Sequence, residues 1–209
     1  MKRGRFITFE GGEGTGKSTQ VRLLGQHLTK AGADIVQTRE PGGSPSAEEV
    51  RALLVTGAAD RWSPLAETLL FYAARIEHWR QVIEPALARG AHVVCDRFAD
   101  STMAYQCYAG GLDKHLVQEL HRLAMGKAEP DLTLILDLPI DEGLKRAASR
   151  RDDETRFERK GRAFHERLRN GFLDIARSAP KRCVVIDAAQ SIEKVHEAVR
   201  ATVSARLSL

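Results

Sequence analysis

Five short apolar runs alternate along the chain with longer segments of helical character. The runs are rich in β-branched residues, are too short for helices, and lie next to Gly, Pro or Asp, which is typical of strands. They are RFITFE, ADIVQTRE, AHVVCDR, DLTLILDL and RCVVID, at residues 5–10, 33–40, 91–97, 131–138 and 182–187. Because strands and helices alternate and the runs are almost wholly apolar, we predict an α/β fold with a five-stranded parallel sheet and helices on both faces.

Helices are expected between and after these strands. Ser63 followed by Pro64 fits a helix N-cap with proline at the first helical position. Pro85 is expected to kink or end that helix, because proline has no N–H to donate. The expected helical ranges are 18–30, 47–54, 64–88, 113–125, 141–148, 159–177 and 192–207. With no internal repeat or low-complexity linker, a chain of 209 residues is expected to form a single domain, 1–209, or one domain with a mobile insert.

The composition narrows the class of protein. Hydrophobic residues make up 43% and charged residues 29%, an ordinary soluble balance. Three cysteines lie far apart with no CxxC pair, so neither a disulfide framework nor a zinc site is expected. No apolar run has the length of a signal peptide or a membrane span. We therefore predict a reduced, cytoplasmic protein without a membrane partner.

The net charge is +4 and the pI about 9.1. A basic balance suits nucleic acid, a membrane surface or a phosphorylated small molecule. A nucleic-acid-binding ATP switch is one alternative, but the sequence has no RRM, KH or helix-turn-helix signature, so we expect no nucleic-acid partner.

The topology places the ligand site before any motif is considered. In parallel sheets of this kind, ligands bind beyond the carboxyl ends of the strands. The segments that this rule brings together are 10–18, 39–43, 96–97, residue 137, and 187–190.

The stretch GGEGTGKS matches the phosphate-loop pattern G-x-x-x-x-G-K-[ST], between a predicted strand and a predicted helix. Glycines let backbone N–H groups turn inward around phosphate oxygens, and the helix N-terminus adds positive potential. Lys17 would reach the β- and γ-phosphates of ATP, and the Ser18 hydroxyl would bind Mg²⁺. The residues expected to bind the nucleotide are Gly11, Gly12, Glu13, Gly14, Thr15, Gly16, Lys17 and Ser18. This indicates a P-loop NTPase-type fold.

The phosphate loop alone does not indicate a kinase, since GTPases, motors and transporters also carry it. A guanine-reading NKxD-like element is missing, which argues against a GTPase. Two strands end in aspartate, at Asp96 and Asp137, and either could hold Mg²⁺ through water. We favour Asp96 because Arg97 follows it and would face the same pocket; a strand-end ion pair is the alternative explanation of Asp96 and Arg97.

Three further segments offer side chains to this site. In TREPGG, Arg39 can grip a phosphate with two hydrogen bonds. In FYAAR, Phe71 and Arg75 share a helix face and could stack a base and bond its carbonyl, although a core Phe beside a surface Arg also fits. In STMAYQ, Tyr105 and Gln106 follow the Asp96 strand, although a helix that faces a partner subunit is an alternative.

The segment 146–169 is dense in arginine. A solvated charged face is the usual explanation of such a segment. A mobile basic lid over a triphosphate, at about residues 149–161, is the alternative that suits its place before the last long helix.

Seven segments in order resemble the bacterial thymidylate kinase family. They are FEGGEGTGKST, TREPGG, LLFYAAR, VVCDRF, STMAYQ, PDLTLILDL and TRFE, and the match runs from Phe6 to about Gln190. The resemblance implies a kinase that passes the γ-phosphoryl group of ATP to dTMP in dTTP synthesis, with Mg²⁺ as cofactor. It also implies a homodimer built on the long helices.

The resemblance implies roles at the acceptor site. Phe71 is similar to the residue that stacks on thymine, and Arg75 to the one that bonds a thymine carbonyl, with Gln106 helping to fix the base. Tyr105 matches the residue whose ring disfavours a ribose 2′-hydroxyl. Arg97 and Arg39 resemble ligands of the dTMP phosphate, and Arg51 is a further candidate.

On the donor side, Arg150 resembles the lid arginine that reaches the transferring phosphoryl group, and Arg146 is expected to lie against adenine. The catalytic set implied is Lys17, Asp96, Arg97 and Arg150. The sequence departs from the family pattern at CYAGG, 107–111, and in a lid about one residue longer, which leaves Arg151 and Arg156 as alternatives to Arg150.

Glu13 stands in the middle of a loop that holds anions. Its carboxylate is expected to project toward the acceptor and to accept the 3′-hydroxyl of dTMP, with its repulsion of ATP offset by Lys17, the loop amides, Mg²⁺ and lid arginines. The alternative is that Glu13 points into solvent.

Overall fold

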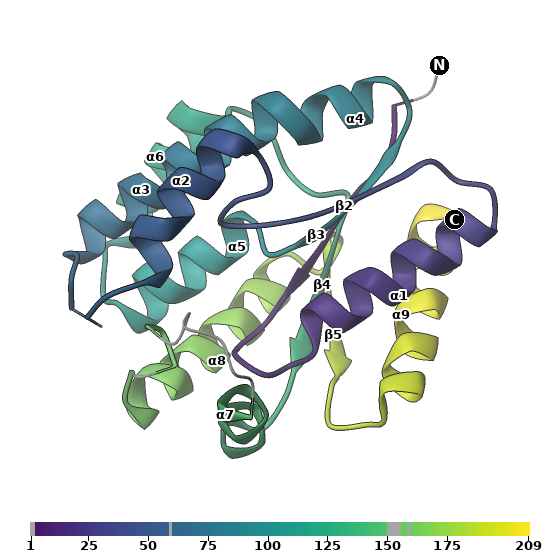
Figure 1. Ribbon diagram of the computed structural model, residues 1–209. Coiled ribbons are helices and arrows are strands. Elements are labelled where there is room, and N and C mark those ends of the chain that lie inside the picture. Colours follow the sequence, from purple (N-terminus) through teal and green to yellow (C-terminus); the bar gives the residue numbers. More distant parts are fainter. Residues whose placement is uncertain (1–2, 59, 150–155, 159) are drawn as a thin grey trace.

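The computed structural model describes residues 3–58, 60–149, 156–158 and 160–209 of the chain. Five parallel strands form one sheet in the order β2-β3-β1-β4-β5 (Figure 1). Their bounds are Phe6–Glu10 (β1), Ile35–Arg39 (β2), His92–Asp96 (β3), Leu132–Asp137 (β4) and Cys183–Asp187 (β5). The predicted α/β fold and five-stranded parallel sheet are confirmed.

Helices cover both faces of this sheet, as Figure 1 shows. Helices α1 and α9 pack on one face, while η1, α4, η2 and α8 pack on the other. The α-helices are Lys17–Lys30 (α1), Pro45–Val55 (α2), Pro64–His78 (α3), Glu84–Ala88 (α4), Ala99–Thr102 (α5), Lys114–Met125 (α6), Ile140–Ala148 (α7), Arg162–Ser178 (α8) and Ile192–Leu207 (α9), and two segments are π-helical, Trp79–Ile83 (η1) and Met103–Ala109 (η2). None of the described helices combines the length and the apolar character needed to span a membrane.

The core lies against the central strands. All five residues of β1 are buried, and Ile7 and Phe9 belong to one apolar cluster with residues of α1 and α9. Fully burying a side chain of this size stabilises the fold by about 1.5–3 kcal/mol. The edge strand β2 differs from the prediction, because its residues are half-buried or exposed rather than buried on both faces. An edge strand has a neighbour on one side only, so fewer atoms cover it.

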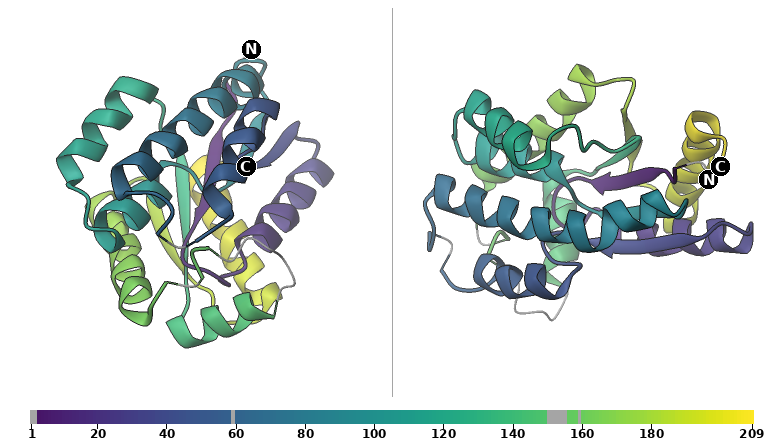
Figure 2. Two further views of the ribbon diagram at one scale, coloured as in Figure 1. Left: turned by 60° about the vertical axis from the view of Figure 1, so that its left-hand side comes forward. Right: turned by 90° about the horizontal axis from the view of Figure 1, so that it is seen from above.

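The predicted helix 64–88 runs through Pro85 as one rod, which the right-hand view of Figure 2 shows. Its middle, η1, is π-helical, and the N–H of Glu84 bonds to the carbonyl of Trp79, five residues earlier. The wider turn makes room for the ring of Pro85 and shifts the hydrogen-bond pattern at the point where proline has no N–H to donate. The proline therefore changes the hydrogen-bond pattern of the helix without ending it.

The segment 99–109 is helical, although it was not among the predicted helices. It starts as one α-helical turn, α5, and continues as the π-helix η2, which ends at Gly110 and Gly111. Such a short segment has no clear 3.6-residue pattern, and its conformation depends on packing against α8 and the sheet. Segments of π-helix are often found at functional sites.

Candidate active site

The turn between β1 and α1 has a backbone that only glycine allows at its crest. Gly14 has φ 68°, and a Cβ added there would lie 2.0 Å from the carbonyl oxygen of Gly143. Helix α1 follows Gly16 with no side-chain cap and no acidic residue in its first turn. Its first N–H groups are therefore left for an external anion.

Lys17 folds back over this loop. Its Nζ donates to the carbonyl of Gly12 at 2.6 Å, to that of Gly11 at 3.2 Å and to Oγ1 of Thr15 at 3.2 Å. Burial lowers the pKa of Lys17 to about 8, and the charge of Arg97 adds to this effect. A bound polyphosphate would favour the charged ammonium again.

Ser18 and Asp96 lie together at the mouth of the loop. The Ser18 hydroxyl donates to Oδ2 of Asp96 over 2.5 Å. By contrast, Asp137 is bound by Arg169 through two hydrogen bonds of 2.7 and 2.8 Å. Of the two aspartates that end strands, it is Asp96 that the fold brings to the phosphate-loop hydroxyl.

Arg97 follows Asp96 with a φ of 69°, a conformation that is strained for a side chain of this kind. Its Nη1 donates to the carbonyl of Gly11 at 2.9 Å and to Oγ of Ser101 at 3.1 Å. Its Nη2 lies 3.3 Å from the carboxylate of Glu13. The guanidinium is thus held between the phosphate loop and the start of α5.

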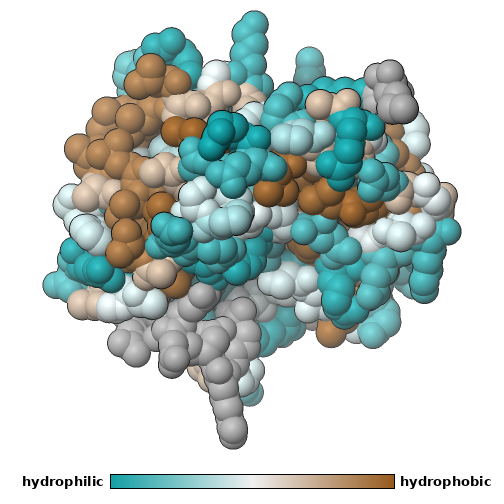
Figure 3. All heavy atoms as spheres, turned by 45° about the horizontal axis from the view of Figure 1, so that its top comes forward, coloured by the Kyte–Doolittle hydropathy of each residue, from teal (hydrophilic) through white to brown (hydrophobic). Residues whose placement is uncertain are grey.

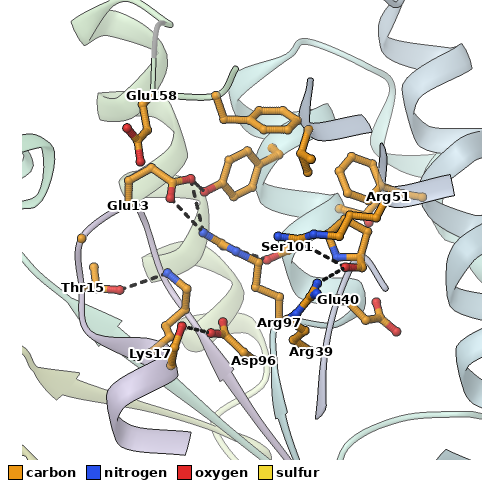
Figure 4. A pocket seen from close by; sticks show the side chains of 18 of the residues that line it. Glu13, Thr15, Lys17, Arg39, Glu40, Arg51, Asp96, Arg97, Ser101 and Glu158 are labelled. Carbon is orange, nitrogen blue, oxygen red and sulfur yellow. Dashed lines mark hydrogen bonds and ion pairs between the residues drawn. The ribbon is translucent and has the colours of Figure 1, made fainter. Parts of the chain in front are cut away.

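Glu13 points across the cavity toward Arg97, as Figure 4 shows. Its Oε1 also accepts a 2.5 Å hydrogen bond from the hydroxyl of Tyr105. Only 15% of the side chain is exposed, so the solvent-facing alternative is wrong. Arg97 compensates its charge directly, a partner that the sequence did not suggest.

Glu10 ends β1 and is fully buried. It accepts hydrogen bonds from the backbone N–H groups of Phe98 (2.8 Å) and Ser101 (3.2 Å) and from the Ser101 hydroxyl (2.6 Å). Burial raises its pKa to about 7, and the nearby charge of Asp100 adds to the rise. Glu10 thereby fixes the turn that carries Arg97, and Phe98, for which the sequence offered no role, packs edge-on against Phe6 in the core.

A cavity of about 450 Å³ lies beyond the carboxyl ends of the strands. It brings together most of the predicted site. The predicted residues that line it are Glu13, Gly14, Thr15, Gly16, Lys17, Ser18, Arg39, Arg51, Phe71, Asp96, Arg97, Tyr105, Gln106 and Arg146.

The remaining predicted residues lie elsewhere. Gly11 and Gly12 line a smaller cavity behind the phosphate loop. Arg150 and its alternative Arg151 lie outside the described residues. Arg156 is 1% exposed and donates to the carbonyls of Leu54 and Ala58, so it is turned toward the end of α2 rather than into the cavity.

Arg75 is buried, which excludes the alternative of a core Phe71 beside a surface Arg75. Its Nε donates to Glu40 at 2.7 Å, and its Nη2 donates to the carbonyl of Phe98 and to Oγ1 of Thr102 at 3.1 and 3.0 Å. Its Nη1 is buried and has no hydrogen-bond partner among the described residues. Glu40 and Thr102 line the cavity, so Arg75 stands directly behind its wall.

Gln106 stands at the same end of the cavity. Its Nε2 donates to Oε1 of Glu67 at 2.8 Å, while its Oε1 is buried and finds no partner within the described ranges of the chain. Three aromatic rings line the same cavity: the ring of Phe157 is 5.4 Å from that of Tyr105 and 6.2 Å from that of Phe71.

Two more arginines line the cavity near the 39–43 turn. Arg39 donates to the carbonyl of Pro41 and pairs with Glu48, both partners being nearly half exposed. Nη1 of Arg51 donates to the same Pro41 carbonyl at 2.6 Å. On the other side of the phosphate loop, Arg146 of α7 donates to the carbonyl of Ala188 at 3.3 Å and pairs with Glu142.

Glu67 was not among the site residues predicted from the sequence. Glu67, Phe71 and Arg75 follow one another at four-residue steps on α3 and so share a helix face. This four-residue spacing could have predicted that Glu67 lies at the same site as Phe71 and Arg75. Glu40 had no such signal, because only the fold brings it against Arg75.

The fold and this site together define a P-loop phosphotransferase. The phosphate loop opens a helix at the sheet's carboxyl edge, and several arginines line the same cavity.

Comparison with known proteins gives the family. The family model for thymidylate kinase matches residues 9–199. The chain is 57% identical to the thymidylate kinase of Caulobacter vibrioides, with 100% of both chains covered. It is 52% identical to that of Afipia carboxidovorans, with 99% of this chain and 91% of the relative covered. The crystal structure of thymidylate kinase from Ehrlichia chaffeensis superposes with a TM-score of 0.79 at 38% identity, covering 97% of this chain and 99% of that one.

The chain therefore belongs to the thymidylate kinase family. The resemblance drawn from the seven sequence segments and the predicted function as a kinase are confirmed.

Proposed function

We propose that this protein transfers the γ-phosphoryl group of ATP to dTMP, giving dTDP and ADP in dTTP synthesis. The observation that carries the choice of acceptor is a pair of buried polar atoms, Nη1 of Arg75 and Oε1 of Gln106, that have no hydrogen-bond partner in the part of the chain that the structure describes. Leaving such an atom unpaired costs about 1–3 kcal/mol. Both atoms are therefore expected to find their partners on the bound base.

The chemistry of the two atoms matches thymine. Thymine offers the O4 carbonyl as an acceptor and N3–H as a donor, so Arg75 would donate to O4 and Gln106 would accept from N3–H. Cytosine carries a donor and an acceptor in the reverse places, and both contacts would fail. The half-buried ring of Phe71 at the cavity wall supports stacking on the base.

Transfer of the phosphoryl group needs no strong general base. A phosphate monoester has its second pKa near 6, so the attacking oxygen of dTMP is already anionic at about pH 7. We propose that Arg39, Arg51 and Arg97 bind the dTMP phosphate, and that Lys17 and Arg97 neutralise charge on the transferring group. Catalysis is then positioning and charge neutralisation.

The residues present fit a magnesium ion. The Ser18 hydroxyl and the Asp96 carboxylate are hard oxygen ligands held side by side, and Mg²⁺ characteristically binds one or two protein oxygens together with phosphates and water. Ser18 and Asp96 would hold the ion. When bound, the ion would neutralise negative charge on the ATP phosphates.

The sugar and the donor nucleotide complete the proposal. Glu13 would accept the 3′-hydroxyl of dTMP, and the ring of Tyr105 beside it would disfavour a 2′-hydroxyl; their hydrogen bond supports a shared place at the sugar. Arg146 would lie against adenine. Arg150 remains the predicted lid arginine that reaches the transferring group.

We further propose a homodimer in the cytoplasm, with no nucleic-acid or membrane partner. Helices α3 and α6 expose large apolar side chains, among them Leu69 at 49% and Leu123 at 80%. Figure 3 shows brown, hydrophobic atoms gathered on the left, the side where Figure 1 places these helices. Light scattering should give twice the chain mass for the wild type and a lower mass for Leu69→Glu, with Ile192→Glu on α9 as control.

A coupled assay of ADP release over a panel of nucleoside monophosphates tests the acceptor. We expect turnover with dTMP far above dCMP, dAMP and dGMP. Equal turnover with dCMP would contradict the proposed base contacts. A DNA titration over a range of salt concentrations tests the absence of a nucleic-acid partner, and tight, salt-dependent binding would contradict it.

A further inference from the structure

Glu67 links the base end of the cavity to a buried arginine. Its Oε1 accepts the hydrogen bond from Nε2 of Gln106 at 2.8 Å, and its Oε2 pairs with Nη1 of Arg156. The Glu67 side chain is 10% exposed and that of Arg156 is 1% exposed. We infer that Glu67 is a positioning residue for base selection, because it fixes which end of the Gln106 amide faces the substrate. This inference rests on the proposed function, in which Gln106 meets the base.

The reason lies in what a carboxylate can do. An ionised carboxylate accepts hydrogen bonds and cannot donate one, whereas an amide has one end that donates and one that accepts. Facing Glu67, Gln106 must turn its NH₂ group toward the carboxylate, which leaves its oxygen buried in the cavity wall without a partner among the described residues. A site with an oxygen at this point selects a base with an N3–H donor, thymine or uracil, and rejects cytosine.

Arg156 compensates the negative charge of the buried Glu67 carboxylate. Its guanidinium pairs with Glu67 and also donates to the carbonyls of Leu54 and Ala58, so the buried carboxylate has a compensating cation. The next residue, Phe157, lines the cavity and packs against Phe71. Glu67 thus joins the base-facing amide to the segment that covers the same end of the cavity.

Replacing Glu67 by glutamine removes the acceptor-only partner that orients the Gln106 amide. An amide at position 67 can donate as well as accept, so Gln106 can turn its NH₂ group toward the base and meet N3 of cytosine. We expect Glu67→Gln to lower the ratio of kcat/KM for dTMP to that for dCMP by roughly tenfold or more, the loss typical of one mispaired buried hydrogen bond. The ratio for dTMP to dUMP should not change, because uracil and thymine share N3–H and O4.

Glu77→Gln is the matched control. Glu77 lies on the same helix and also accepts from a glutamine, Gln81, and an arginine, Arg80, but away from the cavity. It should leave both ratios unchanged. If Glu67→Gln proves too unstable to assay, the double variant Glu67→Gln with Arg156→Met removes both charges, and the same shift in ratio is expected.

Gln106→Leu separates this inference from the proposed function. If Gln106→Leu lowers the dTMP to dCMP ratio but Glu67→Gln or the double variant does not, the inference about Glu67 is overturned and the base contact stands. If Gln106→Leu also leaves the ratio unchanged, the base contact itself is wrong. A general weakening of the fold would reduce turnover of both acceptors together and leave the ratio unchanged, which also counts against the inference.

Discussion

The hydroxyl of Tyr105 donates a 2.5 Å hydrogen bond to Oε1 of Glu13, joining the π-helix η2 to the middle of the phosphate loop. The two residues are 92 positions apart in the chain. Because Arg97 lies against the same carboxylate, three side chains from three segments meet where the two substrate phosphates would approach. In the proposed complex, the Glu13 carboxylate would therefore be directed away from ATP and toward the acceptor.

Glu13→Ala should chiefly raise KM for dTMP, by roughly tenfold or more, because a charge-assisted hydrogen bond to the 3′-hydroxyl contributes about 1.5–3 kcal/mol. Steady-state kinetics at saturating MgATP, with dTMP and its 3′-deoxy analogue, measure the effect. The analogue has no hydroxyl to offer and should be spared. Glu13→Ala also removes the hydrogen bond between Tyr105 and Glu13. Tyr105→Phe removes that bond but keeps the Glu13 carboxylate, and therefore serves as the control. An equal loss with both acceptors would show that the 3′-hydroxyl contact is wrong.

Lys17→Ala should lower kcat by about 10²–10³-fold while leaving the fold intact, because it removes a charge contact to the transferring group. Kinetics and circular dichroism on the same preparation test this. The neighbouring variant Arg22→Ala, exposed on α1, should have near-normal turnover. Near-normal turnover of a well-folded Lys17→Ala protein would exclude the role proposed for Lys17.

Asp96→Asn should raise the Mg²⁺ concentration needed for half-maximal activity, because the amide is a weaker ligand for a hard cation. Asp137→Asn is the matched comparison, since Asp137 ends a neighbouring strand but is bound by Arg169. Titrations of activity with Mg²⁺ at fixed total ATP distinguish them. If only Asp137→Asn raised the Mg²⁺ concentration for half-maximal activity, Asp137 rather than Asp96 would be the metal ligand.

Arg75→Ala should lower kcat/KM for dTMP at least about tenfold and narrow its lead over dCMP, because a donor to the base is lost. It should also reduce the free energy of unfolding by about 3–5 kcal/mol, because Glu40 is left buried with its main ion-pair partner gone. Urea denaturation should show part of this loss recovered in Arg75→Ala with Glu40→Gln. Unchanged ratios over the monophosphate panel would place base selection elsewhere.

Glu10 should make stability depend on pH. Burial, with Asp100 adding to it, raises its pKa from 4.5 to about 7, so the folded state holds a proton that the unfolded chain has already released. The stabilisation that Glu10 provides is therefore fully present below about pH 4.5 and is lost as pH rises through 7. The free energy of unfolding falls by about 3 kcal/mol in all over this range. The hydrogen bond from Ser101 and the positive charge of Arg97 oppose this rise in the pKa of Glu10.

Urea denaturation at several pH values between 4.5 and 8 measures this effect. Relative to Glu10→Gln, which mimics the protonated form, the wild type should lose free energy of unfolding as pH rises. The exposed Glu49→Gln should follow the wild-type profile. Parallel profiles for the wild type and Glu10→Gln would show that Glu10 does not titrate in this range.

The local chemistry of the site was predictable from the sequence. GGEGTGKS specifies a loop with positive φ angles and an uncapped helix start, because glycine and the helix N-terminus act over a few residues. The β-branched runs specify strands, and parallel strands place Lys17, Asp96 and Arg97 at one edge. Local propensity and the connection rules of parallel sheets are enough for these results.

The tertiary structure decided which of these groups are buried and which atoms they face. Sequence spacing could not choose between a surface and a buried Arg75, because its partner Glu40 lies on another strand end. Pro85 was expected to interrupt its helix, yet packing keeps the helix continuous through a π-helical turn. The contact of Glu67 with Gln106 joins residues 39 positions apart. Burial and long-range hydrogen bonds depend on the whole fold, so no local pattern in the chain determines them.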